Sequence, residues 1–162
     1  MIQSLNILNK IIFSRLLLQN TKHTCVVYNI LKKYNGNDYK NILFDDSHKI
    51  ITNYKKNIYY YKYSFENNNF CPKYNLDIIK FPPYSYTNFH YHNNKGCLFT
   101  LLEGNLMEIV EIEADKSCEQ KAYKQLQKYY PSYINDFIGR HKIVNNTDKP
   151  AYSLQLYSNK LI

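Results

Sequence analysis

The stretch NFHYHNNKGCLFTLLEGNL, residues 88–106, joins two closely spaced histidines to a short apolar run that ends at a glycine. Such a run between turn-forming residues is typical of a buried β-strand. Residues i and i+2 of a strand point to the same face, so His90 and His92 are expected to project side by side. This geometry suits metal binding, although two histidines alone also fit a polar surface or a hydrogen-bonded core.

Short runs rich in Ile, Tyr, Phe and Val continue on both sides of this stretch. They are separated by turn residues and cover residues 49–52, 58–65, 74–81, 88–92, 97–104, 105–113, 133–139, 140–146 and 151–158. This spacing predicts a small all-β sandwich or barrel. Residues 118–130 have a helical composition and are expected to connect two strands.

The front of the chain has a different pattern. Residues 4–19 and 24–34 show helical periodicity, and Gly36 is expected to end the second helix. A chain of 162 residues is long enough for one domain and too short to expect two. We therefore expect one structural domain, with residues 1–47 as a helical segment packed on a β-barrel formed by residues 48–162.

Positive charge is concentrated in this front part, where residues 1–62 contain ten Lys/Arg and three Asp. A basic, tyrosine-rich surface can bind nucleic acid. However, Lys, Asn, Tyr and Ile are enriched along the whole chain, and no nucleic-acid-binding motif accompanies the charge, so we expect no nucleic-acid partner.

Location is predicted from cysteine spacing and from the first residues. The four cysteines form no CxxC pair, which favours a reducing compartment. No run of 18 apolar residues occurs, so no membrane span is expected. Residues 1–22 lack acidic residues and fit either a mitochondrial transit peptide or an ordinary amphipathic helix. We favour the helix and a cytoplasmic location.

A third histidine strengthens the metal hypothesis. His141 lies in another strand-like run, directly after a glycine turn. Two imidazoles from one strand and a third from a distant strand would form a three-nitrogen site with open positions for other ligands, which a reactive metal needs. His23 and His48 lack such partners and are expected at the surface.

The segments HYHNNKGCLFTLLEGNL (90–106) and YINDFIGRHKIVNNTDKPAYSLQLYS (133–158) resemble cysteine dioxygenase, a thiol dioxygenase family of the cupin superfamily. The likeness extends over about residues 74–158 and includes the spacing of Gly104 and Asn145. Cys97 stands where most cupins carry a glutamate ligand, which is characteristic of the dioxygenase. The resemblance implies a mainly β fold, a cupin-type small β-barrel (jelly roll) preceded by N-terminal helices.

The resemblance also implies a site and a reaction. His90, His92 and His141 would bind one ferrous ion, Fe(2+), and Cys97 would form a thioether bond with Tyr157. The enzyme would be a monomer that oxidises L-cysteine with O2 to cysteine sulfinate, in cysteine catabolism and on the route to taurine. The Tyr157 hydroxyl would orient or protonate the oxygen species, and the partners would be a small thiol and O2.

Two positions depart from the family pattern. The closing motif of serine, histidine and tyrosine becomes Ser153, Gln155 and Tyr157, and an amide can hydrogen-bond a phenol but cannot carry a proton as imidazole does. The family's Tyr-x-Arg stretch, which binds the substrate carboxylate, is most similar to "YKYSF". This predicts Tyr63 as the substrate-binding residue, with Phe65 where arginine is expected. Lys62 is expected on the opposite face of the strand, and Arg140 is expected to point away from the site.

Other functions stay open on these grounds. One is a metal-binding cupin without catalytic activity, and another is a dioxygenase for a different small thiol, 3-mercaptopropionate or cysteamine. Zinc on the same three histidines would instead favour hydrolytic chemistry.

Overall fold

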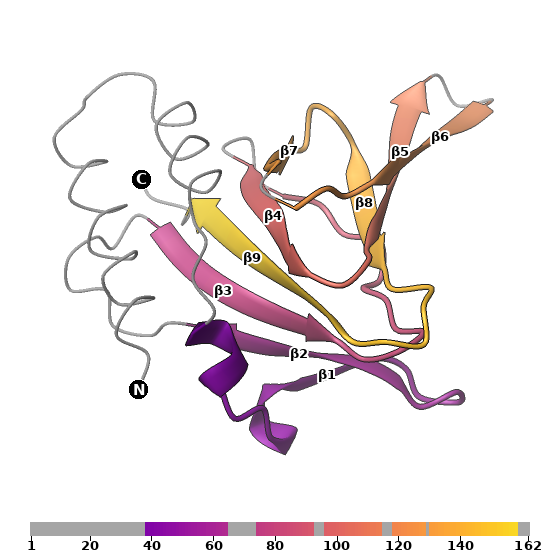
Figure 1. The fold of residues 1–162 in the computed structure, drawn as a ribbon. Coiled ribbons are helices and arrows are strands. Elements are labelled where there is room, and N and C mark those ends of the chain that lie inside the picture. The colour runs from indigo at the N-terminus through magenta and orange to yellow at the C-terminus, as the bar shows by residue number, and fades with distance from the viewer. Residues whose placement is uncertain (1–37, 65–73, 93–95, 115–117, 129, 159–162) are drawn as a thin grey trace, which may run out of the picture.

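The computed structural model describes residues 38–64, 74–92, 96–114, 118–128 and 130–158 (Figure 1). The helices expected over residues 4–19 and 24–34 lie outside these ranges. Within the described ranges, no helix has the length and apolar character needed to cross a membrane. The described elements are two short 3-10 turns and nine strands: η1 (Asp38–Asn41), η2 (Asp46–His48), β1 (Lys49–Asn53), β2 (Ile58–Ser64), β3 (Tyr74–Phe81), β4 (Cys97–Glu103), β5 (Met107–Ala114), β6 (Cys118–Gln125), β7 (Ser132–Ile134), β8 (Arg140–Val144) and β9 (Ala151–Ser158).

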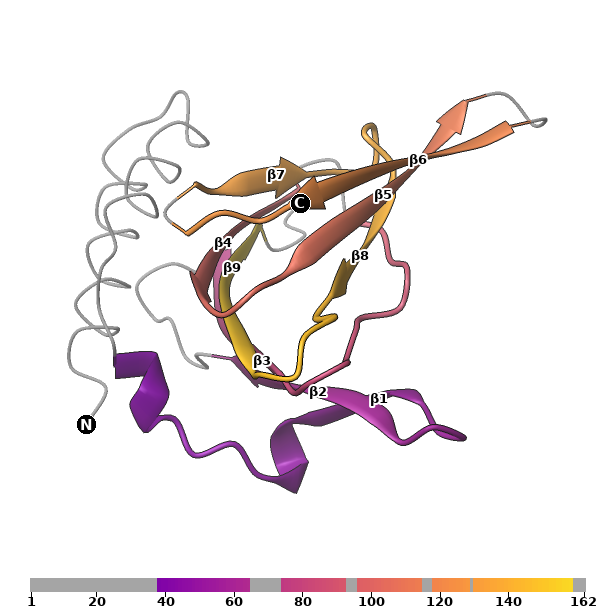
Figure 2. The same ribbon diagram turned by 45° about the vertical axis from the view of Figure 1, so that its right-hand side comes forward.

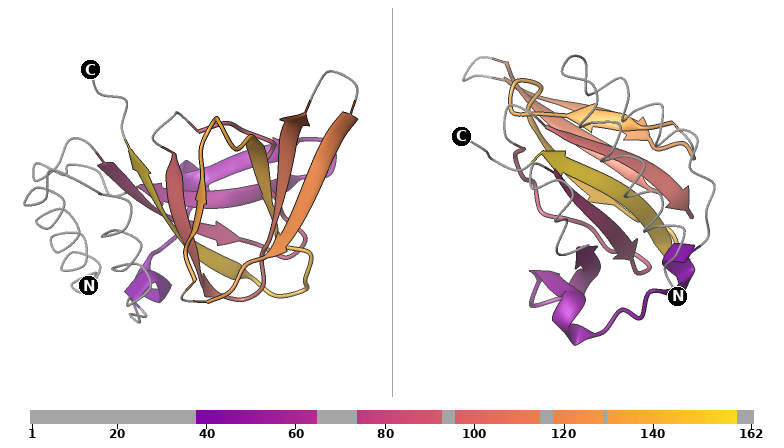
Figure 3. Two further views of the ribbon diagram at one scale, coloured as in Figure 1. Left: turned by 90° about the horizontal axis from the view of Figure 1, so that it is seen from above. Right: turned by 90° about the vertical axis from the view of Figure 1, so that its left-hand side faces the viewer.

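The strands form two antiparallel sheets that face each other. The larger sheet has the order β1-β2-β3-β9-β4-β7, and the smaller has the order β6-β5-β8. The view from above shows β5, β6 and β8 standing opposite the curved larger sheet (Figure 3, left). Two facing antiparallel sheets built from short strands confirm the predicted mainly β fold of the jelly-roll type.

The side of the larger sheet that faces into the barrel carries much of the hydrophobic core. Residues of four strands point to this side in alternation, and the most deeply buried include Phe81, Phe99, Ala151 and Ile79. Complete burial of one large apolar side chain contributes about 1.5–3 kcal/mol to the free energy of unfolding. The same alternation directs Cys97 and Tyr157 toward the barrel interior, where they lie opposite each other on β4 and β9.

The opposite side of the larger sheet is also buried. Leu76, Ile78, Leu154 and Leu156 have at most 3% of their surface exposed. Burial on both sides explains why the middle of β3, residues 76–79 (LDII), carries apolar residues on both faces rather than a strict polar and apolar alternation. A charged residue in the middle of this run, Asp77, is therefore an exception.

The connection between β3 and β4 lies along β8 and places two of the histidines (Figure 2). It forms isolated antiparallel bridges from Tyr86 to Val144 and from His90 to His141. Tyr86 and His90 are four residues apart in the connection, whereas their partners Val144 and His141 are three apart in β8. The connection therefore contains an extra residue and is not a regular strand. The expected strand over residues 88–92 is thus an extended segment that pairs with β8 only locally.

A buried asparagine closes the end of β8 next to this connection. Asn145 is fully buried, and its amide Nδ2 donates to the carbonyl oxygens of Phe81, Pro82 and Lys149 at 2.8–3.1 Å. Its Oδ1 accepts hydrogen bonds from the backbone N–H and the hydroxyl of Thr147. Asn145 therefore has a structural role, holding the β8–β9 connection against the end of β3.

Gly104 makes the tight turn between β4 and β5. Its φ of +83° lies in the left-handed region, and a Cβ atom there would come within 2.7 Å of Ala151. Both the backbone conformation and the close approach therefore require glycine at this position.

Two expectations from the sequence are wrong in detail. Residues 118–125, expected to be part of a helix, form strand β6, which pairs with β5 from Met107↔Gln125 to Ala114↔Cys118. Helix-forming composition is a weak preference, and the backbone hydrogen bonds offered by β5 outweigh it. The run 133–139 contributes only the end of β7 (Ser132–Ile134), because residues 135–138 form a turn closed by the Asn135 side chain.

Candidate metal centre

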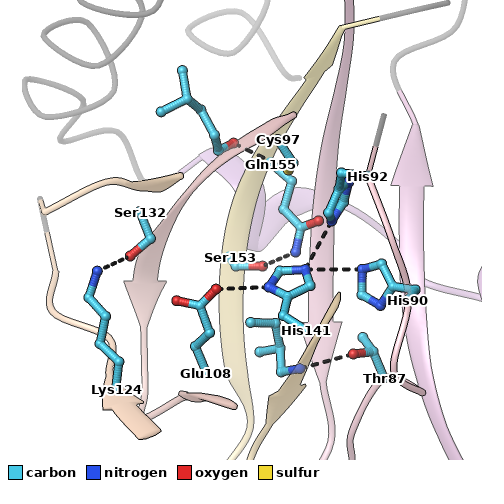
Figure 4. A network of polar contacts seen from close by, with 12 residues as sticks. Thr87, His90, His92, Cys97, Glu108, Lys124, Ser132, His141, Ser153 and Gln155 are labelled. Carbon is cyan, nitrogen blue, oxygen red and sulfur yellow. Dashed lines mark hydrogen bonds and ion pairs between the residues drawn. The ribbon is translucent and has the colours of Figure 1, made fainter. Parts of the chain in front are cut away.

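The pairing of the β3–β4 connection with β8 brings His90 and His141 together. The His90 N–H donates to the His141 carbonyl at 2.9 Å, and the His141 N–H donates to the His90 carbonyl at 3.0 Å. Residues directly opposite each other in an antiparallel pair project to the same side. Both imidazoles therefore project to one side of the pair, and His92, two residues further, joins them (Figure 4).

The three imidazoles converge through the same ring atom. Nε2 of His141 lies 2.9 Å from Nε2 of His92 and 3.2 Å from Nε2 of His90. His92 and His141 are buried, with 8% and 2% of their surface exposed, and His90 is partly buried. The structure thus brings together the three residues that the sequence predicts as metal ligands.

Hydrogen bonds on the outer ring nitrogens orient two of these rings. Nδ1 of His90 lies 2.9 Å from the backbone carbonyl oxygen of Asn88, which can only accept, so Nδ1 carries the proton. Nδ1 of His141 lies 2.8 Å from a carboxylate oxygen of Glu108, which is 3% exposed. These contacts favour the tautomers that direct the Nε2 lone pairs toward the common centre.

This arrangement fits a bound transition-metal ion. Lone pairs of three nitrogens directed at one point repel one another unless a cation lies between them. A single proton on Nε2 of His141 could form a hydrogen bond to Nε2 of His90 or of His92, but not to both. Neutral imidazole suits iron, zinc, copper and nickel, and a set of three ligands leaves further coordination positions open. The donor set therefore fits a divalent transition metal.

Burial favours the neutral, metal-binding form of His90 and His92. Desolvation lowers the pKa of His90, and it lowers the pKa of His92 to about 3, with the neighbouring His141 adding to the effect. At neutral pH a metal ion would therefore meet little competition from protons at these nitrogens.

Replacement of Glu108 by glutamine should weaken metal binding about 10- to 100-fold, because the amide cannot hold the His141 ring with the charge of a carboxylate. The measurement is a competition titration with a chelator of known affinity. Glu111→Gln is the matched control, since Glu111 is a buried acid of the same strand that pairs with Arg140 and Lys121 instead. Equal metal affinity in both variants would contradict a role for Glu108.

Cys97 and Tyr157 lie beside the histidines. They are directly opposite on β4 and β9, and the Tyr157 ring stacks on that of His92 with 5.5 Å between centroids. Burial raises the pKa of the Cys97 thiol and of the Tyr157 hydroxyl well above their usual values. Both groups therefore keep their protons at neutral pH.

The Ser153, Gln155 and Tyr157 side chains form a chain of hydrogen bonds along β9. The Tyr157 hydroxyl donates to Oε1 of Gln155, and Nε2 of Gln155 donates to the Ser153 hydroxyl at 3.3 Å. The amide oxygen of Gln155 thus accepts a hydrogen bond from the Tyr157 phenol and orients its O–H group.

A cavity of about 470 Å³ opens beside His90 and His92. Its wall combines apolar residues of β1 and β3 with polar groups of the larger sheet and of the β3–β4 connection. The residues that line it are Ile50, Ile51, Thr52, Tyr60, Lys62, Ile79, Thr87, Asn88, His90, Tyr91, His92, Gly96, Gln155 and Tyr157.

The structure places the expected substrate-binding residue elsewhere. Tyr63 does not line the cavity, and its ring lies on the other face of β2, 5.3 Å from that of His48. Lys62 does face away from Tyr63, as expected, but that face is the cavity wall, which it shares with Tyr60. The structure thus places Tyr60 and Lys62, rather than Tyr63, on the cavity side, and "IYYYKYSF" contains several tyrosines that fit the same pattern. Arg140 pairs with Glu111 at 2.6 Å and does not line the cavity.

Sequence reasoning missed several groups of this site. Alternation along β5 is ambiguous, since acidic and apolar residues occur on both faces, and so it did not single out Glu108. The Asn88 carbonyl has no side-chain pattern that could have indicated it. Asp77 was detectable in principle, as the one acidic residue within the apolar run of β3.

Two facing antiparallel sheets, with three converging histidines of which His90 and His92 line a cavity beside the larger sheet, define a cupin-type fold. A model of the family "Cysteine dioxygenase type I" matches residues 46–161. The chain belongs to this family.

Comparisons with individual proteins agree. The chain is 36% identical over 90 residues to cysteine dioxygenase type 1 of Homo sapiens, a match that covers 53% of this chain and 45% of that protein. The match thus spans about half the length of the curated relatives. A recombinant oxalate oxidase in complex with glycolate is 12% identical with a TM-score of 0.51, over 62% of this chain and 51% of its own. A cupin-2 domain from Rhodospirillum rubrum is 13% identical with a TM-score of 0.50, over 64% and 62%. These two similarities concern the fold.

Proposed function

We propose that the chain is an iron-dependent thiol dioxygenase that oxidises L-cysteine with O2 to cysteine sulfinate. The observation that carries this proposal is the convergence of three imidazoles beside a cavity that is also lined by tyrosine side chains and by the ammonium group of Lys62. Family membership supports the same reaction. The thiol and O2 combine without another reductant, because both oxygen atoms end on sulfur and the thiol proton is released.

Fe(2+) held by His90, His92 and His141 would supply open positions at which a thiol loses its proton and meets O2. The chain's own residues would hold the substrate there. Neutral ligands leave the positive charge of the ion uncompensated, which favours the thiolate over the thiol. The apolar wall formed by Ile50, Ile51 and Ile79 would exclude water around the reacting sulfur.

Lys62 is the group that would recognise the substrate carboxylate. Its ammonium lies over the Tyr157 ring, 5.3 Å from the centroid, and it lines the cavity together with Tyr60. A carboxylate held by Lys62, and by the Tyr60 hydroxyl beside it, would direct the thiol of a small amino acid toward the histidines. Lysine offers a point charge rather than the planar fork of arginine, so orientation would depend more on the surrounding residues.

Tyr157 would orient the oxygen species at the oxidising centre; its one O–H donates to Oε1 of Gln155 in this structure and would have to turn away from that partner to donate to the oxygen species. Its raised pKa keeps the hydroxyl protonated, and its ring contacts His92 directly. Gln155 holds the hydroxyl but cannot exchange a proton with it in the way a histidine could. We therefore assign positioning of the phenol, rather than proton transfer, to Gln155.

Oxygen consumption by the ferrous protein tests the function. L-cysteine should stimulate O2 uptake, and mass spectrometry should show a product two oxygen atoms heavier than the substrate. Metal analysis of protein purified without added metal should find iron. No uptake with any thiol, or a site filled by zinc and active in hydrolysis, would contradict the proposal.

A second candidate is a dioxygenase for another small thiol. It is favoured by one observation, the presence of lysine rather than a bidentate arginine in the cavity. The assay with 3-mercaptopropionate and cysteamine beside L-cysteine separates these substrates by their kcat/KM values.

The Cys97 and Tyr157 pair gives an independent prediction. A thioether bond between them would replace one S–H and one ring C–H bond, with O2 as the oxidant, so the intact mass should fall by about two hydrogens after turnover. A faster-migrating band should appear on denaturing gels and should be missing from Cys97→Ala. An unchanged mass after many turnovers would exclude the bond and leave the metal site unaffected.

A further inference from the structure

Asp77 is a carboxylate at a position where the fold offers almost no water. It lies in β3 between Leu76 and Ile78 and is 1% exposed. Its side chain points into the barrel, directly opposite Gln155 of β9. A buried carboxylate is costly unless a cation or hydrogen-bond donors compensate it. Asp77 therefore requires a partner within the barrel.

That partner is Lys62 of the neighbouring strand. Nζ of Lys62 lies 2.9 Å from Oδ2 of Asp77. Lys62 is opposite Ile79 in the β2–β3 register, so Asp77 is its diagonal neighbour on the same face. Neither carboxylate oxygen accepts a well-aligned hydrogen bond from the described residues, so the Lys62 contact is an ion pair. Burial raises the pKa of Asp77, and Lys62 opposes that effect. The Ser64 side chain, opposite Asp77 in the same register, also lowers the pKa of the carboxyl.

The ion pair sets the position of Lys62 within the cavity. A lysine side chain has four flexible carbons and normally extends its ammonium into solvent. Here 65% of the Lys62 side chain is buried, and the ammonium lies between the Asp77 carboxylate and the Tyr157 ring. An ammonium has three N–H groups, so contact with Asp77 leaves others available to a ligand in the cavity.

We propose that Asp77 is a positioning residue that determines substrate specificity, because it holds the Lys62 ammonium at the cavity wall and thereby favours small thiols that carry a carboxylate. The inference rests on the proposed function only in taking this cavity as the thiol site. It assigns to Asp77 no contact with substrate, and its effect passes through Lys62.

Binding in the absence of O2 tests this role without relying on turnover. Calorimetry on the iron-loaded protein compares L-cysteine with cysteamine, which has the same thiol and amine but no carboxylate. Asp77→Asn should raise the Kd of L-cysteine about tenfold, because Lys62 is no longer preorganised, and should change that of cysteamine less than about twofold. A merely structural role for Asp77 would weaken the binding of both thiols alike, and tighter binding of L-cysteine would show that Asp77 opposes rather than supports Lys62. Either result would overturn the proposal.

A double-mutant cycle shows whether Asp77 acts through Lys62. In the Lys62→Met background, Asp77→Asn should cause no further loss of L-cysteine affinity, because the group that Asp77 positions is already missing. Additive losses would overturn the proposal. Asp77→Asn alone leaves Lys62 without its partner and could fold poorly. The double variant removes both charges of the ion pair, so its L-cysteine affinity can then be compared with that of Lys62→Met. Asp77→Glu retains the charge and should restore part of the L-cysteine affinity.

Glu103→Gln is the matched control. Glu103 of β4, on the same sheet as Asp77, forms an ion pair with Lys40 at 2.7 Å but does not line the cavity, so its loss should leave both affinities unchanged.

The two proposals fail in different ways. A wild-type protein that discriminates between the two thiols but consumes no O2 contradicts the dioxygenase and leaves the test of Asp77 intact. A wild-type protein that binds both thiols equally overturns the role of Asp77, whatever its activity.

Discussion

His141→Ala should lose its metal and its thiol-dependent O2 uptake together, each by at least about 100-fold. His141 is the ring that both other Nε2 atoms approach, at 2.9 and 3.2 Å. Its removal leaves two imidazoles from a single segment, and two ligands hold an ion in a fixed geometry far less well than three. The measurements are metal analysis of the purified variant and oxygen consumption with L-cysteine.

The same change also leaves Glu108 without its partner, so stability must be followed separately. A buried carboxylate that loses a hydrogen-bond partner costs about 1–3 kcal/mol or more, and the melting temperature should fall accordingly. His48→Ala is the control, since His48 contacts Asp45 at the surface and lies away from the cavity. Wild-type metal content and activity in His141→Ala would mean that the third ligand is misassigned.

Lys62→Met should raise the KM for L-cysteine about 10- to 100-fold while changing the KM for cysteamine less than about threefold. Removal of one member of a fully buried charge pair usually reduces affinity by more than this. The Lys62 side chain is 35% exposed, so water screens part of its charge and the expected effect is smaller. Iron content should stay near the wild-type level, because Lys62 is not among the three converging ligands and its charge disfavours rather than supports a cation beside His90 and His92.

Lys80→Met provides the comparison for this experiment. Lys80 belongs to the adjacent strand and lies over the rings of Phe44 and Tyr61, on the side of the sheet away from the cavity. Its replacement should leave both KM values unchanged. An equal rise in KM for L-cysteine and cysteamine in Lys62→Met would show that Lys62 supports the cavity without recognising a carboxylate.

The predicted and observed strands agree most closely where an apolar-rich run is bounded on both sides by turn residues. The runs at 74–81 and 151–158 coincide with β3 and β9, since hydrophobic runs of this length bounded by turns have few other stable conformations. The agreement fails for β6, whose composition favours a helix. Its conformation depends on hydrogen bonds from β5, a partner that local sequence cannot reveal.

The candidate site divides in the same way. The three histidines were identified from spacing and resemblance, and the fold brings them together. The expected roles of Cys97, Ser153, Gln155 and Tyr157 stay predictions, although the structure places all four on neighbouring strands beside the cavity or the core. Tyr63 lies on the face of β2 away from the cavity, three residues after Tyr60, because an odd change of register moves a side chain to the other face of a strand.

The sequence by itself determined the class of fold, the positions of most strands and the residue types able to bind a metal, because these depend on local periodicity and on side-chain chemistry. Only the tertiary structure decided which atoms meet. The pairing of His90 with His141 and the contact of Glu108 with the His141 ring join residues far apart in the chain, and the ion pair that holds Lys62 in the cavity joins two strands. Such contacts depend on register between strands, and register results from the packing of the whole barrel rather than from any one segment.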